Sequence, residues 1–357
     1  MISSISKVQD KPAAGTRPYS VYVYPNIDRK LMGSNNPYIE KLKKAIGMNE
    51  LEIDPAVTSQ AFPDLLVKGL RSDMVILNWL ENLPLRRMGI LQTAVVMVYL
   101  RLLKARGIKI VWIKHNKISH NRKRFFISKW IHRTLTRYAD HIMTHSNDVD
   151  VVPGEKLLYL PHPSNIGPES VLPPEHPSAA PVIDLLIWGS LLPYKGVLEF
   201  LQFVKTDAEL QGMKIHVVGK SSAEYWAQLQ AAVSPNVTLS NQFIEEADLS
   251  QLFRKARFIL FTYNKKSVMS SGVLIDSLAA CRKIIAPDCG AFSDLSKEYS
   301  FVQLFDNFSE IAAICREHYD NYTLDYDEVC GFVARNSWYN MGKKIKELAG
   351  SGREGSY

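Results

Sequence analysis

The sequence alternates short apolar segments with longer helix-forming ones, and it runs through this alternation twice. The apolar segments are five to eight residues long and rich in Val, Ile, Leu and Tyr, which is typical of buried strands. In the first half they are Ser20–Pro25, Asp73–Trp79, Ile108–His115, His141–Ser146 and Lys156–Pro163. In the second half they are Val182–Gly189, Lys214–Gly219, Asn236–Asn241, Phe258–Tyr263 and Lys283–Pro287.

Segments with helical spacing separate these strands. The expected helices are Tyr38–Ile46, Leu91–Arg106, Arg122–Tyr138, Gly196–Lys205, Ala223–Ala232, Leu249–Lys255 and Val273–Cys281. Strands that alternate with helices form parallel sheets covered by helices on both faces. The predicted fold class is therefore α/β, with two Rossmann-like doubly wound domains.

A proline-rich stretch, residues 167–181, separates the two sets of strands and is predicted to be a semi-rigid linker. A chain of 357 residues suits two domains better than one. The other predicted parts are a flexible leader (1–18), a first domain (19–166), a second domain (182–330) and a C-terminal segment (331–357). That segment contains a helix, Trp338–Leu348, which is expected to pack back on the first domain.

Charge is distributed unevenly between the two halves. Residues 1–180 hold 25 Lys and Arg against 15 Asp and Glu, a net charge of +10, whereas the whole chain carries only +7. A basic first half indicates an anionic partner there, such as a phosphate-bearing substrate, an anionic membrane surface or a nucleic acid.

Several other classes of protein are disfavoured. The four cysteines form no CxxC pair and have no zinc-finger spacing, which favours reduced thiols and no metal site. The polar start of the chain does not look like a signal peptide. The most apolar run, residues 90–103, is interrupted by Gln92, Thr93 and Arg101 and is shorter than the roughly 20 residues that span a bilayer. A cytoplasmic protein without a transmembrane helix is expected.

Two loops of the second half combine glycine or serine with the start of a helix. Gly189-Ser190-Leu-Leu-Pro-Tyr-Lys195-Gly follows a predicted strand, and its backbone amides and Lys195 could hold a diphosphate. Ser270-Ser271-Gly272 precedes a helix and offers hydroxyls and free amides for the same purpose. An ordinary turn and a plain helix cap remain alternative interpretations of these two loops.

The first half carries two histidines after a predicted strand, in Lys114-His115-Asn116-Lys-Ile-Ser-His120. Either could serve as a general base or a ligand contact, although single histidines are more often structural. Downstream, no acidic residue lies between Lys117 and Arg137, and aromatic residues are interleaved with the basic ones. This segment could meet anionic lipid headgroups, or it could be a solvated helix face. No nucleic-acid-binding module accompanies the charge, so nucleic acid is not expected as a partner.

In their order and spacing, these segments resemble GT-B-fold glycosyltransferases of the family 4 type, in particular the bacterial enzymes of exopolysaccharide, capsule or O-antigen assembly. WGSLLPYKG (188–196) is similar to the family's donor loop, and YADHIMTHS (138–146) and VWIKHNKISHN (111–121) are similar to its "aD.ii.HS" and "HN..PH" stretches. SVMSSGVLIDSLAACRKIIAPDCGAF (267–292) is similar to the "SG..L.A...G.PVIAP..G" stretch. The resemblance runs from about Tyr19 to Leu348 and implies two domains facing a cleft.

The resemblance also implies a set of site residues. The donor diphosphate would be held by Gly189, Ser190, Lys195, Ser270, Ser271 and Gly272, and the nucleoside by Gly219, Phe243, Ile244 and Asp276. Ser34, Asn35 and Asn116 would lie on the acceptor side, and the base would be His115 or His120, with Glu81 and Asp28 behind them.

The sequence departs from the family at two places. Ser190 replaces the usual arginine of the donor loop, and Val268 and Asp276 occupy the positions of the usual pair of glutamates. Contacts to the transferred sugar and the ribose therefore do not carry over directly.

The predicted function is transfer of a sugar from a nucleoside-diphosphate sugar to a saccharide acceptor at the inner face of the cell membrane, without metal or cofactor. The acceptor is expected to be lipid-linked. The segment Lys117–Arg137 would contact the anionic membrane surface. The alternatives are a nucleotide-sugar epimerase on the same fold and a non-catalytic protein that binds sugar nucleotide or membrane.

Overall fold

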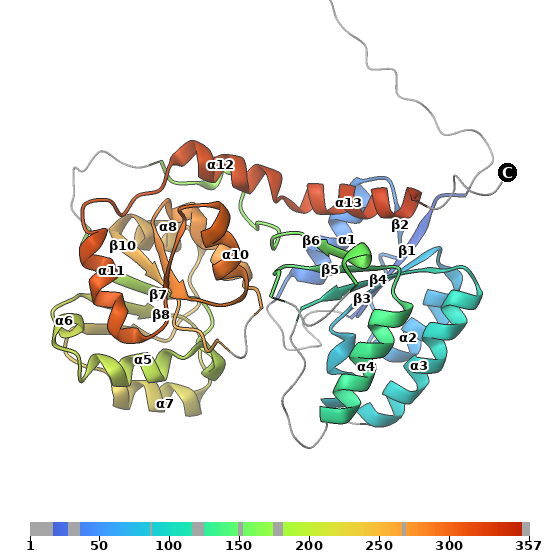
Figure 1. Ribbon diagram of the computed structural model, residues 1–357, viewed down its shortest axis with the longest axis horizontal. Helices are drawn as coiled ribbons and strands as arrows, with labels where there is room; N and C mark the ends of the chain where they lie inside the picture. Colours follow the sequence, from blue (N-terminus) through green and yellow to red (C-terminus); the bar gives the residue numbers. More distant parts are fainter. Residues whose placement is uncertain are drawn as a thin grey trace, which may run out of the picture.

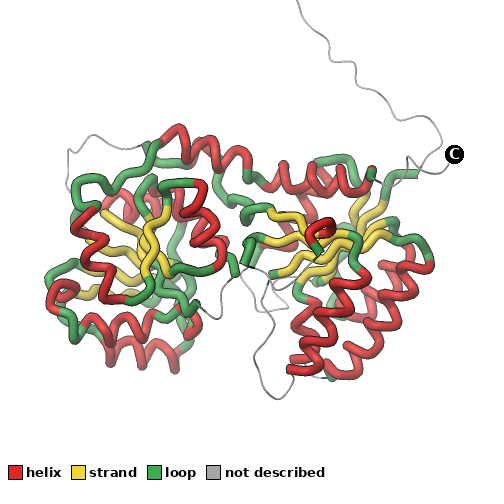
Figure 2. The backbone as a smooth tube through the Cα atoms, in the orientation of Figure 1, coloured by secondary structure: helices red, strands yellow, loops and turns green. Residues whose placement is uncertain are grey.

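The structure is a computed structural model that describes residues 17–27, 36–85, 88–115, 125–148, 153–173, 181–265 and 269–351. Two lobes lie side by side, each with a sheet enclosed by helices (Figures 1 and 2). Each sheet has six strands, and every neighbouring pair is parallel. This confirms the predicted α/β class with two doubly wound sheets.

The first sheet has the strand order β2-β1-β3-β4-β5-β6. Its strands are β1 (Ser20–Tyr24), β2 (Glu52–Ile53), β3 (Met74–Asn78), β4 (Lys109–Lys114), β5 (His141–Thr144) and β6 (Leu157–Tyr159). The helices of this lobe are α1 (Tyr38–Met48), α2 (Ala61–Lys68), α3 (Gly89–Ala105) and α4 (Phe125–Tyr138). α3 closely matches the helix predicted over Leu91–Arg106, and Gly107 follows it with φ of 69°, the left-handed conformation typical of a helix end.

Alternating residues of the first sheet pack into two separate cores. Tyr22 and Tyr24 face α2, α3 and α4, whereas Val21 and Val23 face α1. A second helix, α13 (Trp338–Gly350), covers the same face as α1, although it comes from the far end of the chain (Figure 1). Its Ile345 is fully buried there, and such burial contributes roughly 1.5–3 kcal/mol per side chain.

The second sheet has the order β12-β11-β10-β7-β8-β9. Its strands are β7 (Ile183–Trp188), β8 (Ile215–Val218), β9 (Val237–Ser240), β10 (Ala256–Leu260), β11 (Ile284–Pro287) and β12 (Val302–Phe305). Its helices are α5 (Val197–Val204), α6 (Ala208–Gln211), α7 (Ala223–Ala232), α8 (Glu246–Lys255), α9 (Gly272–Ser277), α10 (Gly290–Glu298), α11 (Ile311–Glu317) and α12 (Tyr326–Arg335).

The sequence missed some of these elements. It did not predict the edge strands β2 and β12, because β2 has only two residues and β12 has four with Gln303 among them, so neither gives a long apolar run. The boundary predicted at residue 330 falls inside α12, the helix that carries the chain back towards the first lobe (Figure 1).

Candidate functional site

The strand order defines one crevice in each sheet. Ligands of open α/β sheets bind beyond the carboxyl ends of the strands, where the strand order reverses. In the second sheet that point lies between β7 and β10, so the loops that follow these two strands flank it. In the first sheet it lies between β1 and β3, whose carboxyl ends carry Asn26 and Trp79.

Lys195 lies in the loop after β7, and its side chain is only 6% exposed. Its Nζ sits 5.4 Å from the centre of the Tyr263 ring. Within the described residues no carboxylate pairs with this ammonium group. Burial lowers the pKa of Lys195, because the charged form loses solvation. A buried cation without a counter-ion is unfavourable, so this position favours an anionic ligand.

Close packing of the loops fixes the position of Lys195. A Cβ added to Gly189 would lie 3.7 Å from Lys195 Nζ and 3.4 Å from the side chain of Val273, at the start of α9. Gly196 has φ of 68°, and a Cβ there would lie 2.2 Å from the carbonyl oxygen of Thr262. The Thr262 hydroxyl in turn donates to the Lys195 carbonyl oxygen at 2.7 Å. The loops after β7 and β10 therefore meet around the lysine.

Ser271 occupies the N-cap position of α9, but its side chain makes no capping hydrogen bond. Ser271 precedes α9, but its Oγ lies 3.2 Å from the Tyr263 hydroxyl, and no side chain bonds the first amides of the helix. Ser270 Oγ is buried without a hydrogen-bond partner among the described residues. Ser190 is exposed. Among the described residues, Ser270 Oγ and the amides of Gly272 and Val273 are thus available to a ligand, whereas the Leu274 amide already donates to the Ser271 carbonyl oxygen.

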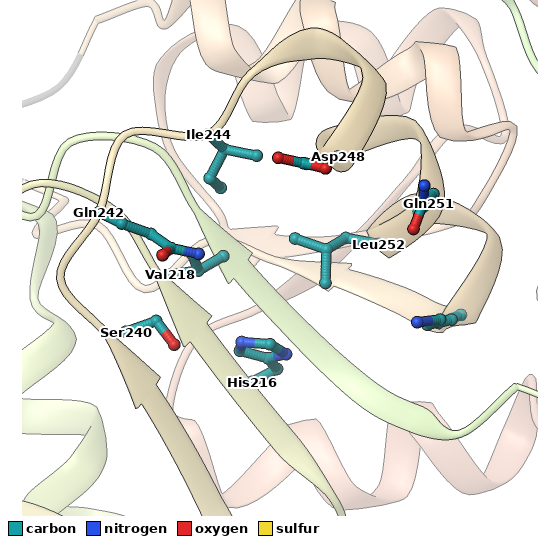
Figure 3. Close-up of a pocket in the computed structure, with 9 residues that line it drawn as sticks. His216, Val218, Ser240, Gln242, Ile244, Asp248, Gln251 and Leu252 are labelled. Carbon is teal, nitrogen blue, oxygen red and sulfur yellow. The ribbon is translucent and has the colours of Figure 1, made fainter.

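The predicted nucleoside side lies beyond β8 and β9. A Cβ on Gly219 would lie 1.7 Å from the Gly189 carbonyl oxygen, so only glycine fits there. Ile244 and Val218 line a cavity of about 200 Å³ between β8, β9 and α8, whereas Phe243 is 68% exposed. Gln242 faces this cavity from the sheet side and Asp248 from α8 (Figure 3). Pockets for whole ligands measure about 300–1,000 Å³, so a cavity of this size fits part of a ligand.

Asp276 has a different environment from the one predicted. Its two carboxylate oxygens accept hydrogen bonds from the backbone amide and the side-chain amide of Asn165, at 3.0 and 2.8 Å. Asn165 precedes the linker and also binds Lys41 and Trp338 through its side-chain oxygen. Asp276 thus ties α9 to the first lobe, which argues against the nucleoside contact predicted for it.

A cluster of aromatic and imidazole rings lies beyond the carboxyl edge of the first sheet. Tyr38 is its centre, and its ring lies 4.8 to 5.7 Å from those of all other members. The other members are Trp79, His115, His145, His162 and Trp338. We call these six residues the ring cluster. Within the part of the chain that the structure describes, no three His, Cys, Asp or Glu side chains are arranged to hold a metal ion.

His115 is held in one orientation by two neighbours. Its ring stacks on Trp79 at 4.4 Å, and its Nε2 lies 3.0 Å from Asn78 Oδ1. Asn78 Nδ2 donates to the Tyr24 carbonyl oxygen, so Oδ1 is the atom that faces His115 and must accept from Nε2–H. Nδ1 therefore carries a lone pair and has no partner in the described part of the chain. Burial, with smaller contributions from His145 and His162, keeps the pKa of His115 well below its ordinary value, so the ring is neutral at pH 7.

The other two histidines of the ring cluster differ in how many of their nitrogens are engaged. His145 donates from Nδ1 to the Leu160 carbonyl oxygen at 2.8 Å and accepts at Nε2 from the Tyr38 hydroxyl at 2.6 Å. His162 donates from Nδ1 to the Pro163 carbonyl oxygen, and its Nε2 has no partner among the described residues. Burial lowers the pKa of His145 to about 4 and that of His162 to about 3.

His162 of the ring cluster contacts the start of α9 in the second lobe. A Cβ on Gly272 would lie 3.1 Å from His162 Cε1 and 3.4 Å from its Nε2, so the imidazole of the first lobe rests on the start of α9. The sequence did not single out His162, His145, Tyr38 or Trp79. The rule that selected His115, a polar residue just after a strand, would also have selected His145.

The remaining predicted residues of the first lobe are the other base candidates and the acceptor-side residues. One of them is buried away from the ligand sites, and the others lie outside the residues that the structure describes. Glu81 is 3% exposed and accepts from the Trp112 indole at 3.2 Å inside the first lobe. This burial argues against the catalytic role predicted for Glu81. Asp28, Ser34, Asn35, Asn116 and His120 lie outside the described residues.

The two lobes also meet at a larger cavity of about 500 Å³. Asn147 and Asp148 line it from the first lobe, and Lys265, Asp288 and the start of α10 from the second. At its edge Asp294 of α10 accepts from the Ser146 hydroxyl at 2.8 Å and from the Asn147 amide at 2.7 Å. The two domains thus face each other across a cleft closed at this edge by buried polar contacts.

Comparison with solved structures shows which class of proteins shares this arrangement. The chain has the fold of GT-B glycosyltransferases. It superposes on HepE of Anabaena, in a crystal structure with UDP, with a TM-score of 0.64 and 11% identity, covering 93% of this chain and 99% of that one. HepE has also been crystallised with UDP-glucose and with UDP and glucose.

Two further similar structures support the same fold. A glycosyltransferase from Rickettsia africae matches with a TM-score of 0.60 and 14% identity, over 96% of this chain and 100% of that one. AviGT4, a glycosyltransferase of avilamycin A biosynthesis, matches with a TM-score of 0.56 and 15% identity, over 95% and 99%. No protein-family model matches the sequence, and no curated protein matches it significantly.

Proposed function

We propose that this chain is a nucleotide-sugar-dependent glycosyltransferase. The observation that carries the proposal is the buried ammonium group of Lys195, which has no carboxylate partner among the described residues and lies where the second sheet reverses its strand order. Such a position suits the diphosphate of a nucleoside-diphosphate sugar. The similar fold of HepE, crystallised with UDP and UDP-glucose, supports a UDP-sugar as the donor.

In this proposal Lys195 stabilises the charge that develops on the leaving diphosphate. Gly189 allows the ligand to approach the backbone, and Ser270 Oγ supplies a hydroxyl that has no other partner in the described residues. Preorganised donors of this kind lower the barrier because they need no rearrangement as the charge forms. The proposal requires no metal ion, since protein cations and amides serve the diphosphate. The nucleobase of the donor would lie towards Gly219 and Ile244, beside the cavity next to α8.

The acceptor would bind over the ring cluster of the first lobe. For a reaction with inversion, the acceptor hydroxyl oxygen attacks the anomeric carbon as the carbon–oxygen bond to the diphosphate breaks. The hydroxyl proton passes to His115 Nδ1, which is neutral, carries a lone pair and is oriented by Asn78. His162 Nε2 lies beside α9 and can accept a hydrogen bond from the sugar. The acceptor would be a lipid-linked saccharide of surface-polysaccharide assembly.

Thermal unfolding with a panel of UDP, GDP, ADP and TDP and their sugars tests the donor site. We expect one nucleoside diphosphate to raise the unfolding temperature of the protein. At a ligand concentration 100 times its Kd, the free energy of unfolding should increase by about 2.7 kcal/mol. Release of that diphosphate from its sugar form, with acceptor lipids present, tests transfer. Stabilisation by none of the nucleotides would refute the donor site, and conversion of the donor sugar without any acceptor would indicate an epimerase instead.

A further inference from the structure

The first lobe exposes apolar side chains along two neighbouring helices, α3 and α4. On α3 they follow helical spacing over three turns, so they form one stripe: Leu91, Val95, Val98 and Leu102. On α4 the exposed stripe contains Phe126, at 82% exposed, and Trp130, followed by Arg133 and Arg137. Soluble surfaces rarely gather so many large apolar residues without a partner.

The two stripes belong to one surface. Both helices pack on the same face of the first sheet, and Arg101 of α3 donates to the Tyr138 hydroxyl of α4 at 2.9 Å. They lie side by side at the outer side of the lobe (Figure 1). Their outward stripes therefore point away from the same sheet, and we call this surface the α3–α4 face.

The charge of the α3–α4 face is entirely positive. Neither helix contains an acidic residue over its 17 and 14 positions. Lys129, Arg133 and Arg137 pair with no carboxylate in the described part of the chain, whereas Lys104 pairs with Asp140. Their charge is thus uncompensated beside exposed apolar rings.

We infer that the α3–α4 face binds the surface of an anionic lipid bilayer. Apolar and aromatic side chains enter the headgroup region while flanking Lys and Arg pair with lipid phosphates. A second copy of the chain would meet the same face with like charges, which is unfavourable. A nucleic acid would leave the exposed aliphatic side chains of Leu91 and Val98 in water. The sequence predicted only the α4 part, over Lys117–Arg137, whose first residues lie outside the description.

The α3–α4 face lies near the ring cluster, and under the proposed function this would hold the cleft close to the membrane. In a parallel sheet the helices begin near the carboxyl ends of the strands that precede them. α3 follows β3 with Trp79, and α4 follows β4 with His115, so the apolar starts of both helices lie on the side of the ring cluster. Binding through this face brings the cleft close to the bilayer. Every helix in the described residues falls short of the length and apolar character needed to cross it.

Vesicle flotation of the full chain tests the inference. We expect the protein to float with vesicles containing one-third phosphatidylglycerol and to stay unbound with pure phosphatidylcholine. Val98→Glu should reduce binding by about tenfold or more, the value of one buried apolar side chain. The matched control is Val182→Glu in the second lobe, where Val182 is 55% exposed and precedes β7. Arg133→Gln should reduce binding about fivefold, in line with one basic residue near an anionic surface.

All variants are first checked for unchanged unfolding temperature and oligomeric state. Equal flotation of the Val98→Glu and Val182→Glu variants would overturn the inference. So would absence of flotation in the wild type, or a dimer that Val98→Glu dissociates, which would identify a second copy as the partner. Because flotation uses no sugar nucleotide, a negative result leaves the donor-site proposal standing.

Discussion

At the carboxyl edge of the second sheet, Lys195 is buried without a counter-ion, and Ser270 Oγ is buried without a partner among the described residues. At the same edge of the first sheet, the polar groups are largely paired: Asn78 holds His115, and Tyr38 and Leu160 hold His145. The two lobes share an architecture, but one leaves charge for a ligand to neutralise and the other fixes neutral rings in place. Under the proposed function, the second lobe would bind the anionic diphosphate and the first lobe would position an uncharged hydroxyl.

The largest expected effect concerns the first lobe. His115→Ala should lower kcat by about 10²- to 10⁴-fold, the usual contribution of a positioned general base. The control is His141→Ala. His141 lies in the same sheet but at the opposite, amino-terminal end of β5, so its replacement should leave turnover unchanged. Steady-state rates with the identified donor and acceptor give the answer. Full activity of the His115→Ala variant would break the proposed division of roles.

Lys195→Ala should reduce turnover by roughly 10²-fold or more, as for loss of one electrostatic contact to a developing charge. It should also abolish stabilisation by the nucleoside diphosphate, because the counter-ion of the diphosphate is gone. Lys205, an exposed lysine after α5 in the same lobe, provides the control, and Lys205→Ala should keep both properties. A Lys195→Ala variant that still binds the nucleotide like the wild type would show that the anion site lies elsewhere.

Gly196→Ala should destabilise the protein by about 1–3 kcal/mol, since alanine would be held at positive φ against the Thr262 carbonyl oxygen. Gly47→Ala is the matched change in α1, where nothing lies within 4 Å of an added Cβ, and it should stabilise by about 1 kcal/mol. Denaturant unfolding measures both. Equal effects of the two substitutions would mean that the packing of the two loops around Lys195 is looser than described.

The smallest effect is a pH dependence that belongs to the first lobe. The pKa of His145 is about 4 when folded, below the ordinary value of 6.5, so the unfolded chain binds the proton more readily. The contribution of His145 to stability is therefore almost fully present above pH 6.5 and is lost as the pH drops towards 4, by roughly 1.6 kcal/mol between pH 6.5 and 5. Denaturant unfolding at the two pH values should show a smaller loss for His145→Asn. An unchanged loss would assign the dependence to other groups.

Much of the fold followed from local pattern. Strands such as Met74–Asn78 and Ile183–Trp188 are buried on both faces, so their apolar runs appear directly in the sequence. The position of the loop over residues 189–196 was predictable for the same reason, because the loop directly follows such a strand. The ring cluster was not predictable as a set, because its members are spread from Tyr38 to Trp338, and Trp338 joins the others only when α13 returns to the first lobe.

The sequence by itself determined the α/β class, the two sheets and the location of Lys195 at a strand's carboxyl end, since these depend on residues close together in the chain. Only the tertiary structure decided which polar groups remain available. It buried Glu81 under Trp112, engaged Asp276 with Asn165 and left a lone pair on His115. Hydrogen-bond pairing and charge compensation depend on residues distant in sequence, and folding alone brings those residues together.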